Sequence, residues 1–318
     1  METVKSLEQK GLLEAIRFFS DPKTCVEAVA SVRWPNGPAC PKCEGKRLSF
    51  LTTRLMWKCL DCQKQFSVKV GTIFEDSPVG LDKWLTAMWM LANCKNGISS
   101  YEIGRGLGVT QKTAWFMLQR IRYAMHHGTI NKMSGTVEVD ETFIGGKARN
   151  MHRNKKAKMQ MYSRVGDNKT VVLGILERAS EGKPSRVRAR VIPSRIRPII
   201  RGIVRETVEQ GTTINSDEHG GHWRMDSEYT HEMVNHLETY VQGNVHTNTL
   251  ENLWSLLKRG LSGTYVSVEP FHLFRYVDEQ AFRYNERRAT DGARFLMVLA
   301  AIAGRRLTWN ALTAKEVG

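Results

Sequence analysis

Two pairs of closely spaced cysteines constrain the fold of this chain more than any other feature. Cys40 and Cys43 form one C-x-x-C pair, Cys59 and Cys62 form the other, and 15 residues separate the pairs. Each pair can present two thiolates from a tight turn, and four thiolates complete a tetrahedral zinc site without an open position. Coincidental pairing of reduced cysteines is the alternative. The spacing predicts a zinc ribbon over residues 36–78 with one structural Zn²⁺.

Two helices joined by a short turn are predicted within residues 79–130. Ser99 or Ser100 is placed to cap the first helix, Gly108 to make the turn, and Thr110 to cap the second helix. In a DNA-binding helix-turn-helix, the residues that begin the second helix face outward and contact base edges. The residues at that place are Gln111, Lys112 and Thr113. A plain helical hairpin between two domains is the alternative.

The positive charge of the chain is concentrated in one block. The formal net charge is +15, and residues 147–205, which begin at Lys147, hold 17 Lys or Arg residues against three acids. Such a block attracts a polyanion and gives salt-dependent binding through counterion release. Within it Arg186, Arg188 and Arg190 alternate with small apolar residues, so one strand face is expected to be basic. The block predicts contact with nucleic acid, and a solvated, solubilising face is the alternative.

A mixed α/β domain is predicted from residue 136 onward. Strand-type segments, a helical segment and a further strand follow one another there, before two more helices. The strand segments are 136–144, 170–176, 187–192 and 212–215, the helical segment between the last two is 196–209, and the later helices are 248–261 and 269–286. This order predicts a ribonuclease-H-like mixed sheet with flanking helices.

Three acids fall where such a fold could bring them together. Asp140 lies in the first of these strands and Asp217 ends the fourth, and these strands are neighbours in a ribonuclease-H-like sheet. Adjacent carboxylates repel unless a cation lies between them, and hard oxygen ligands favour Mg²⁺ or Mn²⁺. Glu251, near the start of the following helix, could reach the same site. Lys258, two turns further along, is placed to meet a DNA phosphate.

With these motifs in view, the chain resembles the bacterial insertion-sequence DDE transposases of the ISXO group. The matching segments are VEVDETFIGGK, INSDEHGGHW, HTNTLENLWSLLKRGLSGTY and HLFRYVDEQAFRYNERR. The N-terminal zinc ribbon of these transposases, C-P-x-C and C-x-x-C followed by F-S, G-T-I-F and S, also has its counterpart here. The similarity covers roughly residues 20–290.

The resemblance implies the chemistry and the partners of the chain. It implies that Asp140, Asp217 and Glu251 are catalytic and hold two Mg²⁺ (or Mn²⁺) ions. DNA cleavage and strand transfer would follow, with the terminal inverted repeats of an element and a target DNA as partners. Lys258 and Arg259 would contact DNA, and synapsis of two ends would need a homodimer or a larger assembly. It says less about Glu141, Glu218, His219 and His222, which are treated as neighbours, and His246 would either orient the active site or serve the entry to the helix.

The remaining expectations concern organisation and location. A helical lead-in is predicted over residues 1–35, with Leu13, Ile16 and Phe19 on its buried side, and a helical tail over 291–318. The catalytic domain is expected over 136–290. Neither a secretory signal nor a bilayer-spanning apolar run is evident, so a cytoplasmic, nucleoid-associated protein is expected. Two alternatives to a transposase are a DNA-binding regulator with a retired catalytic domain and a ribonuclease-H-like nuclease.

Overall fold

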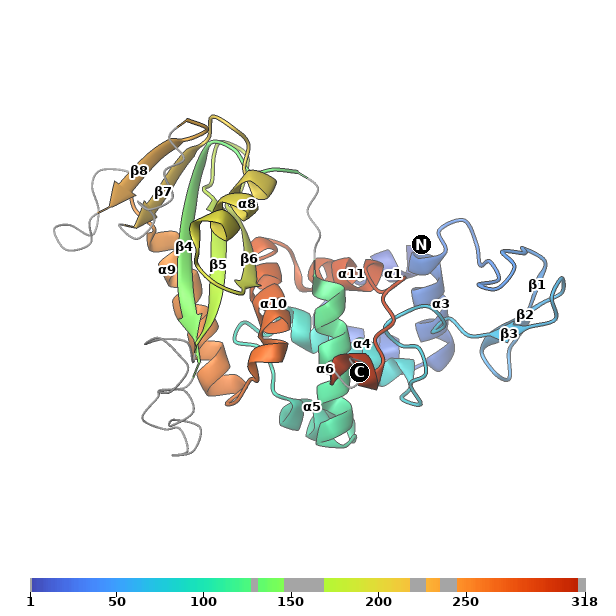
Figure 1. Cartoon of the computed structure of the whole chain (residues 1–318). Coiled ribbons are helices and arrows are strands. Elements are labelled where there is room, and N and C mark those ends of the chain that lie inside the picture. Colours follow the sequence, from blue (N-terminus) through green and yellow to red (C-terminus); the bar gives the residue numbers. More distant parts are fainter. Residues whose placement is uncertain (1, 127–130, 146–168, 218–226, 235–244, 314–318) are drawn as a thin grey trace. The chain divides into compact units, whose positions relative to one another are not determined.

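The computed structural model of the chain divides into two compact units (Figure 1). Unit 1 combines Met1–His126 with Glu286–Gly318, and unit 2 is His127–Asn285. The residues that the structure describes are 2–126, 131–145, 169–217, 227–234 and 245–313. No helix in these ranges is both long and apolar enough to span a bilayer. The segment after residue 285, which includes the predicted helical tail over 291–318, thus clusters with the N-terminal residues.

Unit 1 contains one small three-stranded sheet in the part of the chain described, and this sheet forms the ribbon. Strands β1 (Leu48–Leu51) and β2 (Met56–Cys59) form a hairpin, and β3 (Gln65–Phe66) pairs with the other edge of β2. Leu48 lies opposite Cys59 in the register. Trp57 packs on Phe66 and Trp34, with ring centroids 6.0 and 5.3 Å away. These aromatic contacts support a segment too small to bury a core of its own.

The rest of unit 1 is helical, and the last segment of the chain is built into it. Its helices are α1 (Glu2–Lys5), α2 (Leu12–Phe19), α3 (Pro22–Arg33), α4 (Leu81–Asn93), α5 (Ser100–Leu107), α6 (Gln111–Met125), α11 (Asp291–Ala300) and α12 (Trp309–Leu312). The ring of Phe19 contacts those of Trp89 and Phe295 at centroid distances of 6.5 and 5.4 Å. The buried Arg120 donates to the carbonyl oxygens of Ile73 and Leu307 at 2.9 Å each. Segments far apart in sequence therefore share one core.

The predicted buried side of the N-terminal helix is wrong at two positions. Leu13 and Ile16 are 62% and 42% exposed, whereas Ala15 and Phe19 are buried. The buried pair has the i, i+4 spacing of one helix face, and the aromatic contacts of Phe19 decide which face turns inward. A new helix begins at Pro22, where Asp21 accepts from the backbone N–H of Thr24 at 2.8 Å and caps α3.

Unit 2 contains a five-stranded mixed sheet. Its strands are β4 (Thr136–Ile144), β5 (Thr170–Glu177), β6 (Arg186–Ile192), β7 (Thr213–Asp217) and β8 (Thr230–Val234), in the order β6-β5-β4-β7-β8. The pairs β6-β5 and β5-β4 are antiparallel, and β4-β7 and β7-β8 are parallel. The first and fourth strands of the unit are neighbours. The predicted ribonuclease-H-like mixed α/β fold is confirmed, and β8 is a strand that the sequence did not reveal.

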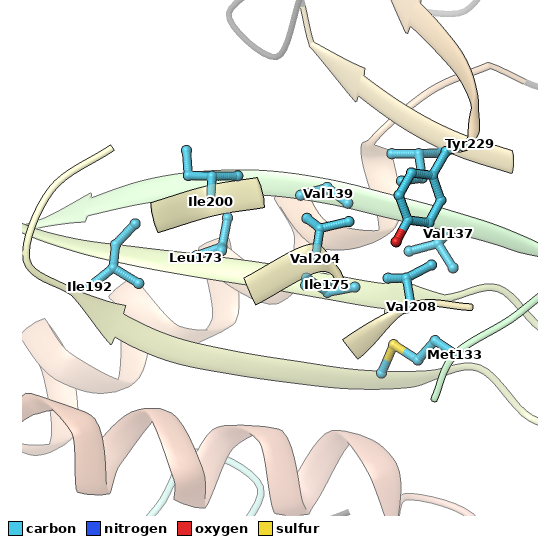
Figure 2. Packing of buried hydrophobic residues seen from close by; sticks show 11 residues of the cluster. Met133, Val137, Val139, Leu173, Ile175, Ile192, Ile200, Val204, Val208 and Tyr229 are labelled. Atoms are coloured by element: carbon cyan, nitrogen blue, oxygen red, sulfur yellow. The ribbon is translucent and has the colours of Figure 1, made fainter. Parts of the chain in front are cut away.

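Helices cover both faces of this sheet. Helix α8 (Arg197–Thr207) packs on one face, where Figure 2 shows Ile200 and Val204 over Val139, Leu173 and Ile175. The opposite face is covered by α9 (Asn248–Arg259), which continues as the π-helix η3 (Gly260–Thr264), and by α10 (Leu273–Asn285), which follows the 3₁₀ helix η4 (Pro270–His272). The alternation of strand side chains assigns each residue of β4 to one of these two faces.

A glycine lets α9 approach the sheet closely. Gly174 on β5 lies opposite Asp140 on β4, and a Cβ at this glycine would lie 2.5 Å from Trp254 and 2.9 Å from Leu250. Both of these α9 residues are buried. The indole of Trp254 therefore occupies the space that a side chain at position 174 would take.

We predict that Gly174→Ala destabilises unit 2 by about 1–3 kcal/mol, the usual cost of overpacking a closely fitted core. Gly202→Ala is the matched control, since nothing lies within 4 Å of a Cβ at that α8 position and alanine favours a helix. Urea unfolding of both variants measures the difference. Equal stabilities would contradict the close packing of α9.

Candidate active site

Asp140 and Asp217 lie on the same face of the sheet, toward α9. Val137 and Ile214 are paired across β4 and β7 and both belong to the core under α8. Asp140 and Asp217 each lie three residues further along their strands, so both turn to the opposite face. The predicted adjacency of the two aspartates therefore follows from the register.

The carboxyl group of Asp140 is held by α9 and surrounded by negative charge. The indole Nε1 of Trp254 donates to Oδ2 of Asp140 at 2.8 Å, and the N–H of Glu141 donates to Oδ1 at the same distance. Burial raises the pKa of Asp140 from 3.8 to about 6, and the charges of Asp217 and Glu251 raise it while the Trp254 bond opposes the shift. The three predicted acids thus act on one another electrostatically.

Glu251 reaches this region from the first turn of α9. Its helix buries Leu250, Leu253, Trp254 and Leu257 and leaves Glu251 exposed at the edge. The effect of its charge on Asp140 places it within electrostatic range of that aspartate. It is the one member of the trio that the sheet does not hold directly.

Glu141 belongs electrostatically to the same cluster, although the sequence showed it only as a neighbour. Burial, followed by the charges of Asp140 and Asp217, raises its pKa from 4.5 to about 7, and the positive charge of Arg195 lowers it. Arg195 is exposed and its guanidinium lies 5.5 Å from the centroid of the Phe143 ring. No sequence motif drew attention to this arginine.

A buried carboxylate that no sequence motif indicated, Glu138, lies two residues before Asp140 on the same strand. Glu138 is fully buried on β4 and forms an ion pair with Arg178, in which Nε lies 2.8 Å from Oε1. It also accepts hydrogen bonds from the hydroxyl of Thr249 and the backbone N–H of Leu250 at the start of α9. Glu138 therefore joins the strand that holds Asp140 to the helix that holds Glu251.

The four predicted zinc ligands come together in the ribbon. The Sγ atoms of Cys40 and Cys62 are 3.6 Å apart, as are those of Cys43 and Cys59, and all four lie within 4.8 Å of one another. Burial opposes ionisation of Cys40, but hydrogen bonds from backbone N–H groups outweigh it and lower the pKa of this thiol to about 7. This geometry fits one tetrahedral Zn²⁺.

The carboxylates are spaced more widely than the cysteines. Among the residues described, no other group of three or more Cys, His, Asp or Glu side chains is gathered as tightly.

The predicted caps around the α5–α6 turn are confirmed. Ser99 rather than Ser100 caps α5, with Glu102 completing a capping box, and Gly108 adopts the left-handed conformation at φ 61°. Thr110 caps α6 through the N–H of Thr113.

The three side chains proposed to contact bases all have intramolecular contacts. Gln111 donates to the hydroxyl of Ser100 at 2.8 Å, and the hydroxyl of Thr113 lies 2.8 Å from that of Thr110. The Nζ of Lys112 lies 4.8 Å from the ring centroid of Trp309, while its side chain stays exposed.

The basic strand β6 is tied into the protein more than its sequence suggested. Arg186, Arg188 and Arg190 share one face, as predicted. Arg186 pairs with Glu177 and Arg190 with Glu206. Arg186 and Arg188 also donate to the carbonyl oxygens of Lys132 and Asn131. The face is basic, but the ion pairs of Arg186 and Arg190 neutralise part of its positive charge within the protein.

The other predicted residues divide into two groups. Lys258 and Arg259 are exposed in the last turn of α9, two turns from Glu251. His246 is bonded to Arg178, whose Nη2 lies 2.8 Å from Nδ1 and 2.6 Å from the carbonyl oxygen of His246. The residues that lie outside the described part are Lys147, Glu218, His219 and His222.

Comparison with known proteins agrees with this fold and arrangement. Residues 132–285 match the family described as the ISXO2-like transposase domain, and residues 20–65 match the transposase zinc-ribbon domain. A curated relative, an uncharacterized protein in the transposable element ISH50 of Halobacterium salinarum, is 26% identical over 260 residues, which cover 78% of this chain and 85% of that protein. Unit 2 therefore defines a transposase-type α/β domain. The chain thus contains a segment that matches the ISXO2-like transposase domain, preceded by one that matches the transposase zinc ribbon.

We predict that Asp140→Asn stabilises the metal-free protein at pH 8. A folded-state pKa of about 6 against 3.8 means that the wild type loses stability as the pH rises from about 4 to 6 and does not regain it above. The amide removes this charge and can still accept from Trp254, so we expect a gain of about 1–2 kcal/mol at pH 8, after allowing for solvent screening.

Urea unfolding with a chelator present, at pH 8 and near pH 4, measures this effect, which should vanish at the lower pH. Glu181→Gln, at an exposed carboxylate of unit 2, is the control. A destabilised Asp140→Asn at pH 8 would show that the acids do not repel one another.

Proposed function

We propose that this chain is a DNA transposase that cleaves and joins DNA by metal-dependent phosphoryl transfer at Asp140, Asp217 and Glu251. The observation that carries the proposal is the electrostatic coupling of three acids from separate segments, of which one is half-buried with a raised pKa. A protein that only binds DNA gains nothing from a half-buried carboxylate whose pKa is raised beside two further acids. The family match supports the same assignment.

The donor set fits hard divalent cations. Carboxylate oxygens are the ligands preferred by Mg²⁺ and Mn²⁺, and a cation among the three acids would relieve their repulsion. When bound, two such ions supply Lewis acidity for activating water and for stabilising the leaving 3′ oxygen. Asp140, fixed by Trp254, and Asp217 would hold the ions from the sheet, and Glu251 would complete the set from α9.

The cations of unit 2 would hold the DNA backbone beside the acids. Lys258 and Arg259 are exposed on the helix that carries Glu251, and Arg195 lies near Glu141. Arg186, Arg188 and Arg190 lie on the α8 face of β6, opposite the acids, so they would contact DNA only where it passes over that other face. Positioning and charge neutralisation carry most of the catalysis of phosphoryl transfer, so such contacts contribute to rate as well as to affinity.

Unit 1 would recognise the terminal inverted repeats of the element. The zinc ribbon and the α5–α6 pair are the two candidate modules, with Gln111, Lys112 and Thr113 at the helix start that would enter the major groove. Lys112 and Gln111 would have to leave Trp309 and Ser100, or contact DNA from those positions. Target DNA would be the second partner, and joining two element ends would call for a homodimer or a larger assembly.

We predict that Asp140→Asn, Asp217→Asn and Glu251→Gln each lower strand transfer by at least about 10³-fold, because each removes a ligand of the reacting centre. The assay follows joining of a labelled element end to a plasmid with Mg²⁺ or Mn²⁺. Glu181→Gln, at an exposed acid of the same unit, should retain wild-type activity. Binding of the labelled end should persist in all four variants.

Two outcomes would favour the alternatives. Equal activity of wild type and Asp140→Asn would remove the catalytic assignment, and DNA binding without any cleavage would favour a regulator. Cutting of branched or hybrid substrates without a joined product would favour a ribonuclease-H-like nuclease.

The ribbon is proposed to hold one structural Zn²⁺. Cys59→Ser should release the ion, because a hydroxyl replaces one of four thiolates, and should weaken binding of the element end by at least about tenfold. Metal analysis of the purified chain and a DNA-binding titration measure both effects. Cys25→Ser is the control, since this buried thiol lies in α3 outside the cluster. A wild-type zinc content near zero would contradict the site.

A further inference from the structure

The start of α9 has an unusual cap. Thr247 occupies the position where a threonine hydroxyl would normally accept from the first backbone N–H groups, yet its side chain makes no such bond. Its hydroxyl is buried, and no protein group accepts from or donates to it in the part of the chain described. The first turn of α9 therefore depends on another group to satisfy its N–H donors.

Glu138 provides that cap from the sheet. Its Oε2 accepts from the N–H of Leu250 at 3.1 Å, and its Oε1 accepts from the hydroxyl of Thr249 at 2.9 Å. A carboxylate at a helix N-terminus also interacts favourably with the helix dipole. Because Glu138 and Asp140 are two residues apart on one strand face, the cap fixes α9 directly beside the first catalytic aspartate.

Arg178 stabilises the buried charge of Glu138 and also links Glu138 to His246, which precedes α9. Its Nε lies 2.8 Å from Oε1 of Glu138, and its Nη2 donates to the carbonyl oxygen of His246 at 2.6 Å. A fully buried carboxylate without such a partner would be strongly destabilising. The arginine also offsets negative charge that would otherwise add to the repulsion among the three acids.

We propose that Glu138, together with Arg178, positions Glu251 for metal binding. This inference rests on the proposed function, because it concerns how the third acid of that site is placed. The sheet register determines the positions of Asp140 and Asp217. The position of Glu251 depends instead on the start of α9, because Glu251 comes directly after Leu250, whose N–H donates to Glu138. Glu138 is a positioning residue, because its two carboxylate oxygens are bonded to Arg178 and to the first turn of α9.

The test compares two fully buried carboxylates of unit 2. Glu138→Gln keeps the shape but removes the charge and one acceptor oxygen, while Glu279→Gln makes the same change at a buried glutamate that pairs with Arg283 on α10. Mn²⁺ affinity is measured by electron paramagnetic resonance on the full chain, and amide hydrogen exchange of the first turn of α9 by mass spectrometry without metal. We expect Glu138→Gln alone to weaken Mn²⁺ binding about tenfold and to speed exchange at the start of α9.

Arg178→Lys is the second variant, for the case in which Glu138→Gln does not fold. It keeps the positive charge but loses the guanidinium group that bridges Glu138 and His246. We therefore expect weaker Mn²⁺ binding and faster exchange at the start of α9, both to a smaller extent than in Glu138→Gln. Wild-type Mn²⁺ affinity in both variants, or equal changes in Glu279→Gln, would overturn the proposal. A wild type that binds Mn²⁺ but neither cuts nor joins DNA would instead overturn the proposed function, since both positioning measurements are made without DNA.

Discussion

The arrangement of unit 2 depends on how closely α9 is docked on the sheet. Gly174 leaves room for the Trp254 indole, and the indole in turn donates to Asp140. Two residues away on the same strand, Glu138 accepts from the first turn of the helix. One helix is thus fixed at two points, an apolar one and a charged one. Its position determines whether an exposed Glu251 can work with two acids that belong to the sheet.

Much of this fold could be predicted from the sequence, because its strongest signals are local. The strand at Thr136–Ile144 has the predicted bounds, and the helix caps at Ser99 and Thr110 follow from residue types with short-range hydrogen bonds. Thr230–Val234 escaped notice because its five residues carry histidine and glutamate among apolar ones and give little alternation. Leu13 and Ile16 were misplaced because tertiary aromatic contacts, which no local pattern reveals, set the inward face of α2.

The candidate site was predictable only as far as its motifs extended. Asp140, Asp217 and Glu251 stand in recognisable segments, whereas the pair of Glu138 and Arg178 forms between residues forty apart through the pairing of β4 and β5. The basic strand shows the reverse error. Its charges were counted correctly, but their intramolecular partners Glu177 and Glu206 could not be identified without the fold. A count of charged residues indicates the overall electrostatic field of the protein. The intramolecular contacts determine which of the cationic side chains are available to bind DNA.

The return of the chain to unit 1 after α10 has a consequence for how the protein is made. A ribosome delivers residues 1–126 first, but the core they form also needs Phe295, Leu307 and Trp309. The unit with the zinc ribbon can therefore reach its final packing only after the whole sheet unit has been synthesised. A transcript cut short near its 3′ end would yield a chain with all three acids and an incomplete partner unit, so the opportunity to act on DNA would be restricted to nearly full-length translation products.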